Sequence, residues 1–162
     1  MVKSVTKSGK GGKMIVWCDK PELTITSDIE PITTVRKPLP TDSKAEKKDK
    51  KNKPFLNKKR VLFDIDYLGS QYCIVIPKGY KWNGANIPRL FWRIIGSMES
   101  VEFLNASLLH DLICENHYLV DNDRQLSSII FREMLIASGV DKIKAQTMYK
   151  AVDIFQKLFC KW

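Results

Sequence analysis

The spacing of apolar residues changes once along this chain, and this change constrains the fold more than any other feature. Between residues 61 and 67, apolar residues alternate with polar ones, which is typical of a strand with one buried face. After Ser100 the spacing becomes three or four residues, as on one face of a helix: Val101, Leu104, Leu108 and Leu112. The sequence therefore predicts an α+β fold, with short antiparallel strands in the N-terminal half packed against a helical C-terminal half of about four helices.

Short strands are predicted at three places in the first half, followed by one hairpin. MIVW (14–17), LTIT (23–26) and ITTV (32–35) are rich in apolar or β-branched residues, and prolines separate them. The hairpin covers residues 61–77 and turns at 68–71. Asp64 and Asp66 share its polar face, either as a solvated surface or as a weak attraction for a cation.

Four helical segments are predicted after the hairpin. The first is short and opens at Pro88, and the second runs from Val101 to about Asn116 behind a Ser100 N-cap. A third runs from about Asp123 to Ala137, capped by Asp121 or Asn122, with Gly139 at its C′ position. Asp141 caps the last helix, which extends to about Phe159 and is expected to bury these residues: Ile143, Met148, Val152, Phe155, Leu158 and Phe159.

The net charge of +9 is concentrated in two segments. Residues 1–13 carry +4 and are predicted to form a flexible basic arm, whereas residues 14–162 are predicted to form a single α+β domain. Residues 36–60 carry eleven basic and three acidic residues, so we expect a Lys-rich loop or insertion. This segment is either a solvated linker or an extension of a hairpin between ITTVRK (32–37) and KRVLFDIDY (59–67).

A basic segment of this kind can contact nucleic acid non-specifically, or an acidic protein surface. It lacks aromatic residues apart from Phe55, and it has no recognition-helix or zinc-finger pattern, which argues against sequence-specific binding. The candidate contact residues are Lys44, Lys47, Lys48, Lys50, Lys51, Lys53, Lys58, Lys59 and Arg60.

Neither a membrane partner nor a signal peptide is expected. No apolar run approaches the roughly 18 residues that a membrane helix needs, and no charged-then-apolar leader opens the chain. The four cysteines are scattered without a C-x-x-C pair, which favours reduced, buried thiols.

The candidate catalytic residues are His110 and Asp111, with Asn83 as a polar helper. An adjacent His-Asp pair on a helix is how several metal-dependent phosphohydrolases begin their sites, although such enzymes need further ligands. His110, Cys114 and His117 follow the spacing i, i+4, i+7 and are the candidates for a zinc site. Because one helix rarely supplies three ligands, we predict no metal and no cofactor.

The Asn83–Pro88 loop has an alternative, structural interpretation. Asn83-Gly84 is a strong turn signal, and Asn86 can cap the helix that Pro88 opens. The loop and the His110–Asp111 pair can then order each other as a rigid corner.

An ordered series of motifs resembles the domain of unknown function 1353 family, which occurs widely in bacteriophages and prophages. The motifs are GYKWNGANIPRLFWRIIGS (79–97), ASLLHD (106–111) and NDRQLSSIIFREMLIASGV (122–140), and the resemblance covers about residues 61–159. Asn83 and Ser128 stand where the family pattern has Asp, and Asn86 stands where it has Ser. Neutral side chains replace charge poorly at a metal or in acid–base catalysis, so these differences argue against catalysis in this chain.

The resemblance implies a polar structural knot in place of an active site: Asn83, Gly84, Asn86, Pro88, His110, Asp111 and Arg124. We therefore expect a phage-encoded, non-enzymatic protein, a virion structural component or assembly factor of the tail or head–tail region. Its partners would be other phage proteins, and its location the virion or the host cytoplasm. The alternatives are a metal-dependent hydrolase using His110 and Asp111, and an inhibitor of host defence.

Overall fold

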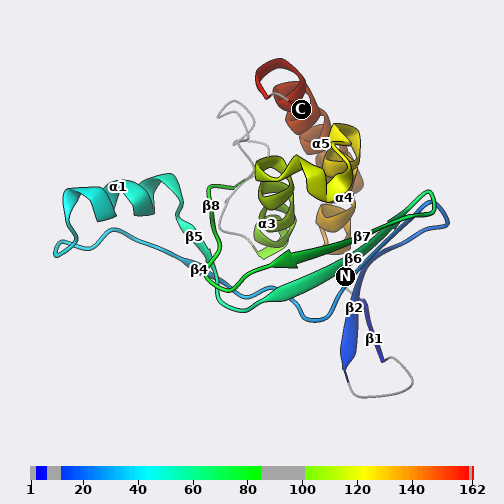
Figure 1. The fold of residues 1–162 in the computed structure, drawn as a ribbon, viewed down its shortest axis with the longest axis horizontal. Helices are drawn as coiled ribbons and strands as arrows, with labels where there is room; N and C mark the ends of the chain where they lie inside the picture. Colours follow the sequence, from blue (N-terminus) through cyan, green and yellow to red (C-terminus); the bar gives the residue numbers. More distant parts are fainter. Residues whose placement is uncertain (1–2, 7–11, 85–100, 161) are drawn as a thin grey trace.

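A five-stranded antiparallel sheet carries the helices on one of its faces. The computed structural model describes residues 3–6, 12–84, 101–160 and 162. The strands are β1 (Lys3–Thr6), β2 (Lys13–Asp19), β3 (Leu23–Ser27), β6 (Val61–Tyr67) and β7 (Ser70–Ile76), in the order β1-β2-β3-β6-β7. The helices are α3 (Val101–Glu115), the 3₁₀ helix η2 (His117–Val120), α4 (Arg124–Ala137) and α5 (Lys142–Phe159) (Figure 1). The α+β prediction is confirmed.

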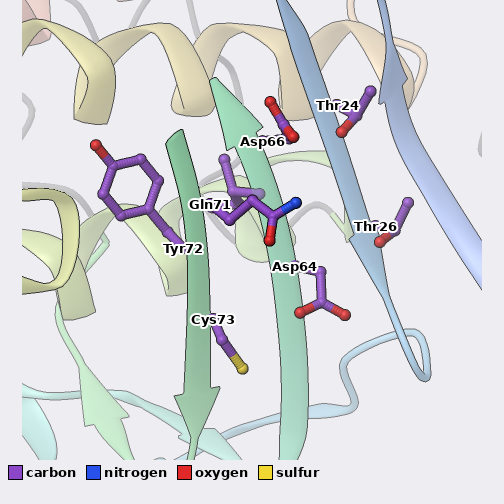
Figure 2. Close-up of a pocket in the computed structure, with 8 residues that line it drawn as sticks. Thr24, Thr26, Asp64, Asp66, Gln71, Tyr72 and Cys73 are labelled. Atoms are coloured by element: carbon purple, nitrogen blue, oxygen red, sulfur yellow. The ribbon is translucent and has the colours of Figure 1, made fainter. Parts of the chain in front are cut away.

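The predicted hairpin at residues 61–77 is present as strands β6 and β7. Leu68 and Gly69 make its two-residue turn with φ values of 50° and 84°, as a type I′ turn requires. Strand alternation places Phe63 and Ile65 in the core, whereas Asp64 and Asp66 lie on the outer face, away from the helices (Figure 2).

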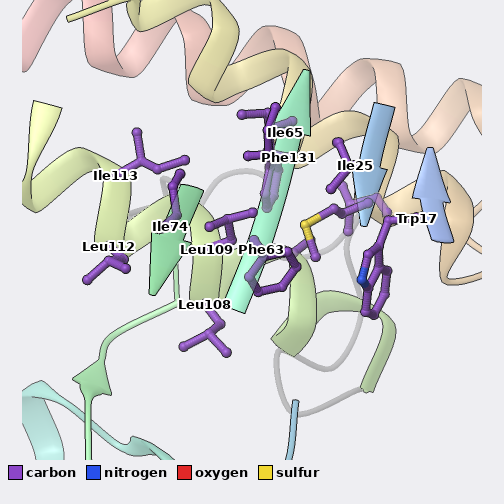
Figure 3. Packing of buried hydrophobic residues seen from close by; sticks show 14 of the residues in the cluster. Trp17, Ile25, Phe63, Ile65, Ile74, Leu108, Leu109, Leu112, Ile113 and Phe131 are labelled. Atoms are coloured by element: carbon purple, nitrogen blue, oxygen red, sulfur yellow. The ribbon is translucent and has the colours of Figure 1, made fainter. Parts of the chain in front are cut away.

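The core lies between the sheet and α3. Figure 3 shows side chains of the sheet, such as Phe63 and Ile74, meeting Leu108 and Leu109 of α3. Residues 103–113 are all buried, so α3 is enclosed on every side, and the single predicted stripe was too narrow. A helix between a sheet and a second helix layer must be apolar, or internally bonded, around its whole circumference.

A second, three-stranded sheet contains β4 (Thr33–Val35), β5 (Phe55–Asn57) and β8 (Lys81–Trp82), in the order β4-β5-β8. The predicted hairpin between residues 32–37 and 59–67 is therefore wrong, because β4 pairs with β5 while β6 pairs with β3 and β7. The reason is burial. Phe55 is 3% exposed and Asn57 is fully buried, so this part of the basic segment belongs to the scaffold.

Helix α1 (Lys44–Asn52) occupies the middle of the segment that we expected to be a solvated loop. It buries no residue, and Figure 1 shows it standing apart from the rest of the domain. Ser43 Oγ accepts from Glu46 N (3.2 Å) and Glu46 Oε2 accepts from Ser43 N (2.7 Å), which is a complete capping box. The Ser-x-x-Glu spacing at 43–46 was the sequence signal for this helix, but the high lysine content of the segment favoured the prediction of a loop.

Within the N-terminal arm, the described residues 3–6 form a strand that the sequence did not predict. Residues 3–6 form β1, which pairs antiparallel with β2 in the register Lys3 to Val16. Composition underestimates such a strand, since an edge strand is held by backbone hydrogen bonds and needs few apolar side chains.

Two of the predicted helix ends are confirmed and one is shifted. Asp141 caps α5, and Gly139 follows α4 with a φ of 103°. The N-cap of α4 is Asp123 rather than Asp121 or Asn122, because the last two have positive φ and belong to the preceding turn. The predicted Ser100 cap and the helix from Pro88 lie outside the described residues.

The predicted inward face of α5 is correct only at its centre. Met148 and Val152 are buried, but Ile143, Leu158 and Phe159 are 79%, 69% and 72% exposed. Figure 1 shows the C-terminal end of α5 extending beyond α3 and α4, so its last turn does not pack against either of these two helices. Among the described helices, none is long and apolar enough to cross a membrane.

Two leucine truncations should separate the core from this exposed helix end. Leu109→Ala removes a fully buried side chain and should lower the free energy of unfolding by about 2–5 kcal/mol. Leu158→Ala removes an exposed one and should change it by about 0.5 kcal/mol or less. Urea unfolding followed by tryptophan fluorescence measures both, and equal costs would contradict this placement of α5.

Candidate functional site

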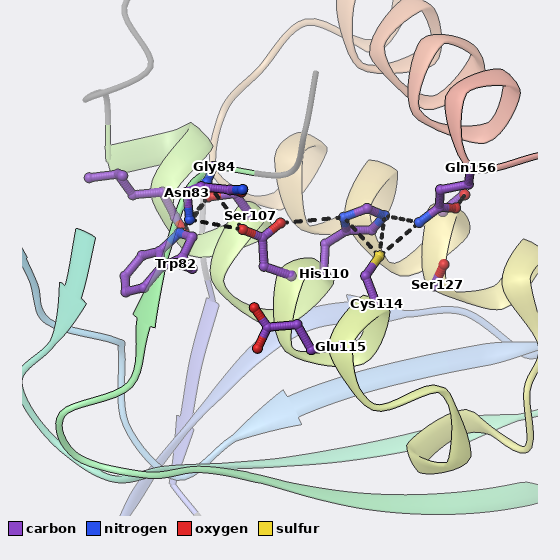
Figure 4. A network of polar contacts seen from close by, with 12 residues as sticks. Trp82, Asn83, Gly84, Ser107, His110, Cys114, Glu115, Ser127 and Gln156 are labelled. Atoms are coloured by element: carbon purple, nitrogen blue, oxygen red, sulfur yellow. Dashed lines mark hydrogen bonds and ion pairs between the residues drawn. The ribbon is translucent and has the colours of Figure 1, made fainter. Parts of the chain in front are cut away.

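The His110–Asp111 pair lies in the second half of α3, and the Asn83-Gly84 turn that follows β8 lies beside it (Figure 4). His110 is 1% exposed and Asp111 is 6% exposed. The structure therefore brings together the three residues that the sequence offered as catalytic candidates, and it encloses two of them.

Asp111 fastens the turn after β8 to α3. Its Oδ2 atom accepts hydrogen bonds from the backbone N–H groups of Asn83 (3.3 Å) and Gly84 (3.1 Å). One turn earlier on α3, Ser107 Oγ accepts from Trp82 Nε1 (3.1 Å). A carboxylate oxygen that accepts from two backbone N–H groups holds both of them in place. These contacts join the small sheet to the central helix.

His110 contacts a second polar group on its other side. Its Nε2 atom is 2.9 Å from Gln156 Nε2, and its ring packs on Phe131 with centroids 5.1 Å apart. Cys114 Sγ is 3.7 Å from both ring nitrogens. An atom equidistant from both nitrogens lies on the plane that bisects the ring, so neither ring N–H points at the sulfur. The Cys114–His110 contact therefore lacks the alignment that a thiol nucleophile and its base require, although the sulfur lies close enough to act on the ring electrostatically.

Opposing influences act on the protonation of His110. Burial lowers its pKa, but the Cys114 sulfur and the Asp111 carboxylate outweigh burial and raise the pKa to about 10. The carboxylate contributes because its Oδ1 atom lies 4.0 Å from His110 Nδ1. The amide of Gln156 suits either state, because it can donate to a neutral ring or, turned over, accept from a charged one.

Gln156 and Ser128 complete this network, and neither was a predicted site residue. Ser128 is fully buried, and its Oγ donates to Gln156 Oε1 (3.0 Å), while Gln156 Nε2 donates to Cys114 Sγ (2.8 Å). The available signal was a polar residue in an apolar stripe, since Gln156 continues the buried series Met148, Val152 on α5.

Of the remaining predicted knot residues, Arg124 is the one that the structure describes, and it does not join Asp111. Arg124 forms an ion pair with Asp153 of α5, so it connects α4 to α5 instead. Asn86 and Pro88 lie outside the described residues. The described knot therefore consists of Asn83, Gly84, His110 and Asp111, extended through His110 to Gln156.

The candidate zinc ligands do not converge. His117 follows the end of α3, and its ring stacks on Trp162 with centroids 3.9 Å apart, whereas Cys114 lies against His110. In the part of the chain that the structure describes, no three His, Cys, Asp or Glu side chains are grouped to hold a metal. The i+7 spacing fails because α3 ends at Glu115.

The basic candidates divide between α1 and the connection from β5 to β6. The lysines at i, i+3, i+4 and i+7 of α1 share one exposed face, called here the lysine face: Lys44, Lys47, Lys48 and Lys51. Lys50 binds Asp42 (2.7 Å), and Lys53 lies 3.7 Å from Glu115. Exposed residues outside α1 complete the set: Lys58, Lys59 and Arg60.

The acidic residues of this segment are already paired. Asp49 accepts from Arg36 (2.7 Å) and Lys81 (3.3 Å), contacts that lower its pKa. Asp42 bonds Leu39 N and Lys50, and Glu46 caps α1. The four lysines of the lysine face therefore form no ion pair with a described residue. The pKa of Asp42 is lowered by its bonds to Leu39 N and Lys50 and, to a smaller extent, by the nearby charge of Lys47.

The fold and the buried knot together define an α+β protein whose His–Asp pair is built into the junction between strands and helices. Residues 59–152 match the family described as a protein of unknown function (DUF1353), and the chain belongs to that family. Helix α1 precedes the matched region.

Two curated proteins of Sinorhizobium fredii are similar to this chain. The uncharacterized protein y4jT is 36% identical over 101 residues, which cover 57% of this chain and 28% of y4jT. The uncharacterized protein y4iH is 31% identical over 78 residues, which cover 48% of this chain and 31% of y4iH. The match thus spans less than a third of either relative's length. No solved structure shows significant similarity to this chain.

Neutralising Asp111 should loosen the knot. Asp111→Asn removes the charge that accepts two backbone N–H groups and should lower the free energy of unfolding by about 1–3 kcal/mol. The matched change Asp121→Asn, at an exposed left-handed position that Asn tolerates, should cost about 0.5 kcal/mol or less. Urea unfolding at neutral pH compares them, and an Asp111→Asn variant as stable as the parent would contradict the role assigned to the carboxylate.

Stability should depend on pH through His110. Because its folded pKa of about 10 exceeds the ordinary 6.5, its contribution is complete below pH 6.5 and is lost as pH rises toward 10. The free energy of unfolding should fall by about 1.4 kcal/mol per unit of pKa difference.

Urea unfolding across this range should show a decline that His110→Gln flattens and that His117→Gln, at the other histidine, preserves. A decline of the same slope in His110→Gln would assign the pH dependence to another group.

Proposed function

We propose that this protein is a phage-encoded, non-enzymatic virion component or assembly factor, of the tail or head–tail region, acting through protein–protein contacts and a basic helix. The observation that carries the proposal is α1. This helix buries none of its residues, so ordering it gains no core, yet it is capped at its start and tied to the scaffold by Arg36 and Asp49. A helix maintained without burial is best explained by what its surface contacts.

The state of the His–Asp pair supports the non-enzymatic part of the proposal. Asp111 is bonded to the backbone of its own fold, and the thiol beside His110 is not aligned with either ring nitrogen. The family resemblance supports the phage origin. The lengths of the two relatives show that regions similar to this chain also occur within longer chains.

Mass spectrometry of purified particles tests the virion role. The protein should be recovered from particles in a constant ratio to known structural proteins through successive gradient steps. A particle preparation without it, from cells that express it, would leave only the assembly-factor role. Normal particle yield after deletion of its gene would then contradict that role as well.

A basic helix of this kind should also bind nucleic acid weakly and without sequence preference. Changing Lys44, Lys47, Lys48 and Lys51 to Gln should lower the affinity for duplex DNA at least about tenfold and reduce the salt dependence. Fluorescence anisotropy at several salt concentrations measures both quantities.

The matched control changes four lysines of α5 to Gln: Lys142, Lys144, Lys150 and Lys157. This variant has the same net charge and should retain binding. If both variants lose binding equally, the interaction follows net charge and does not belong to α1.

The second candidate function is a metal-dependent hydrolase. The convergence of Asn83, His110 and Asp111 at one junction favours it. Elemental analysis of the purified protein distinguishes the two. Stoichiometric zinc or manganese that disappears in a folded His110→Ala variant would support the hydrolase, whereas a metal-free protein that unfolds on this change supports the structural knot.

A further inference from the structure

On strands β2, β3, β6 and β7 the outer face of the five-stranded sheet is acidic, whereas at its β1 edge Lys3 is the register partner of Val16. Strand register places the same kinds of polar side chain side by side across neighbouring strands. One row reads Asp19, Thr24, Asp66, Gln71 and the next reads Val16, Thr26, Asp64, Cys73. Among the described side chains at the outward positions of β2, β3, β6 and β7, the charged ones are all aspartates.

These aspartates have no partner within the described residues. Within that part of the chain, the side chains of Asp64, Asp66 and Asp19 form no hydrogen bond or ion pair, although their backbones pair in the sheet. The face is also hollowed, since a depression of about 520 Å³ lies over Asp64, Asp66, Thr24 and Thr26 (Figure 2). An unpaired, concave, acidic surface is complementary to a convex basic one.

The chain itself carries a surface of that shape and charge in the lysine face of α1. Lysines four residues apart on a helix rise by about 6 Å, and aspartates two residues apart on a strand are about 7 Å apart. Lys44–Lys48 or Lys47–Lys51 can therefore face Asp64 and Asp66 pairwise when α1 lies along β6. The uncharged Thr24 and Thr26 beside them leave room for the lysine stems.

We propose that this protein associates with itself head to tail, with the lysine face of α1 in one molecule docking on the acidic outer face of the sheet in the next. Helix α1 stands apart from its own five-stranded sheet (Figure 1), so the acceptor is a second molecule. Each molecule then uses its lysine face to bind one neighbour and its acidic face to bind another. Repeating this contact produces a closed ring if the rotation between successive molecules closes, and a filament if it does not. The inference rests on the proposed role of α1 as a contact surface.

Sedimentation velocity of the full, nuclease-treated chain tests the association. Species larger than the monomer should form with increasing concentration at about 0.05 M salt, and the apparent dissociation constant should rise at least about tenfold at about 0.5 M. Exposed ion pairs are individually weak and screened, so a contact built from several of them must be steeply salt-dependent. A monomer at every concentration and salt would overturn the proposal.

Charge reversal identifies the two surfaces. The helix variant Lys44→Glu/Lys48→Glu/Lys51→Glu and the sheet variant Asp64→Lys/Asp66→Lys should each be monomeric, whereas their equimolar mixture should associate again. Only exposed or half-exposed side chains change, and circular dichroism checks the fold. The triple change Lys58→Glu/Lys59→Glu/Arg60→Glu alters net charge by the same amount as the helix variant and should leave association intact.

Cross-linking reports the geometry on the unmodified chain. Cys73 is exposed on the acidic face, so a maleimide–succinimide reagent should join it to lysines of α1. Mixed ¹⁴N/¹⁵N protein should show that these links run between molecules. Three outcomes would each overturn the proposal. Cys73 could cross-link to lysines outside α1, the mixture of the two variants could stay monomeric, or association could require added DNA. Recovery of the protein from particles is independent of all these outcomes, so the virion role can stand where head-to-tail association fails.

Discussion

The rest of the domain depends on the hydrogen bonds between the carboxylate of Asp111 and the backbone of the turn after β8. This carboxylate is a buried negative charge, and two backbone amides of the turn satisfy it. The cost of leaving such a charge unpaired fixes the turn against α3, and with it the small sheet that carries α1. The same helix carries His110, whose ring contacts the amide of Gln156 on α5. One buried helix therefore connects the strand side of the molecule with its last helix.

This arrangement changes how a His–Asp pair is to be understood. The pair has the residue types of an acid–base or metal site, yet its lone pairs and N–H groups are directed at the protein's own backbone and side chains. The backbone N–H of Asn83 donates to Asp111 Oδ2, so this part of the network does not require a charged residue at position 83. Neutral residues at 83 and 128 are compatible with such a network, because hydrogen bonding rather than charge is what those positions contribute.

The sequence predicted the elements whose signals are local and repetitive. The β6–β7 hairpin, the caps Asp141 and Gly139 and the central α5 residues Met148 and Val152 follow from periodicity and turn chemistry. The errors arose where pairing is long-range or where context replaces composition. The pairing of β4 with β5 depends on burial of Phe55, and the exposed end of α5 depends on where its neighbours stop. For the site, adjacency in the sequence identified His110 and Asp111, whereas Gln156, 46 residues away, is found only when the fold brings α5 within reach of His110 on α3.

The two segments that flank α1 pair with each other: Arg36 N donates to Pro54 O, and β4 pairs with β5. These paired segments connect α1 to the rest of the domain. Because none of its side chains enters the core, its melting exposes almost no apolar surface. The free energy of its local opening is therefore set by its nine residues, its capping box and the ion pairs of Asp49 with Arg36 and Lys81. A bound partner can order α1, or its removal can release it, while the sheet and the central helix stay intact.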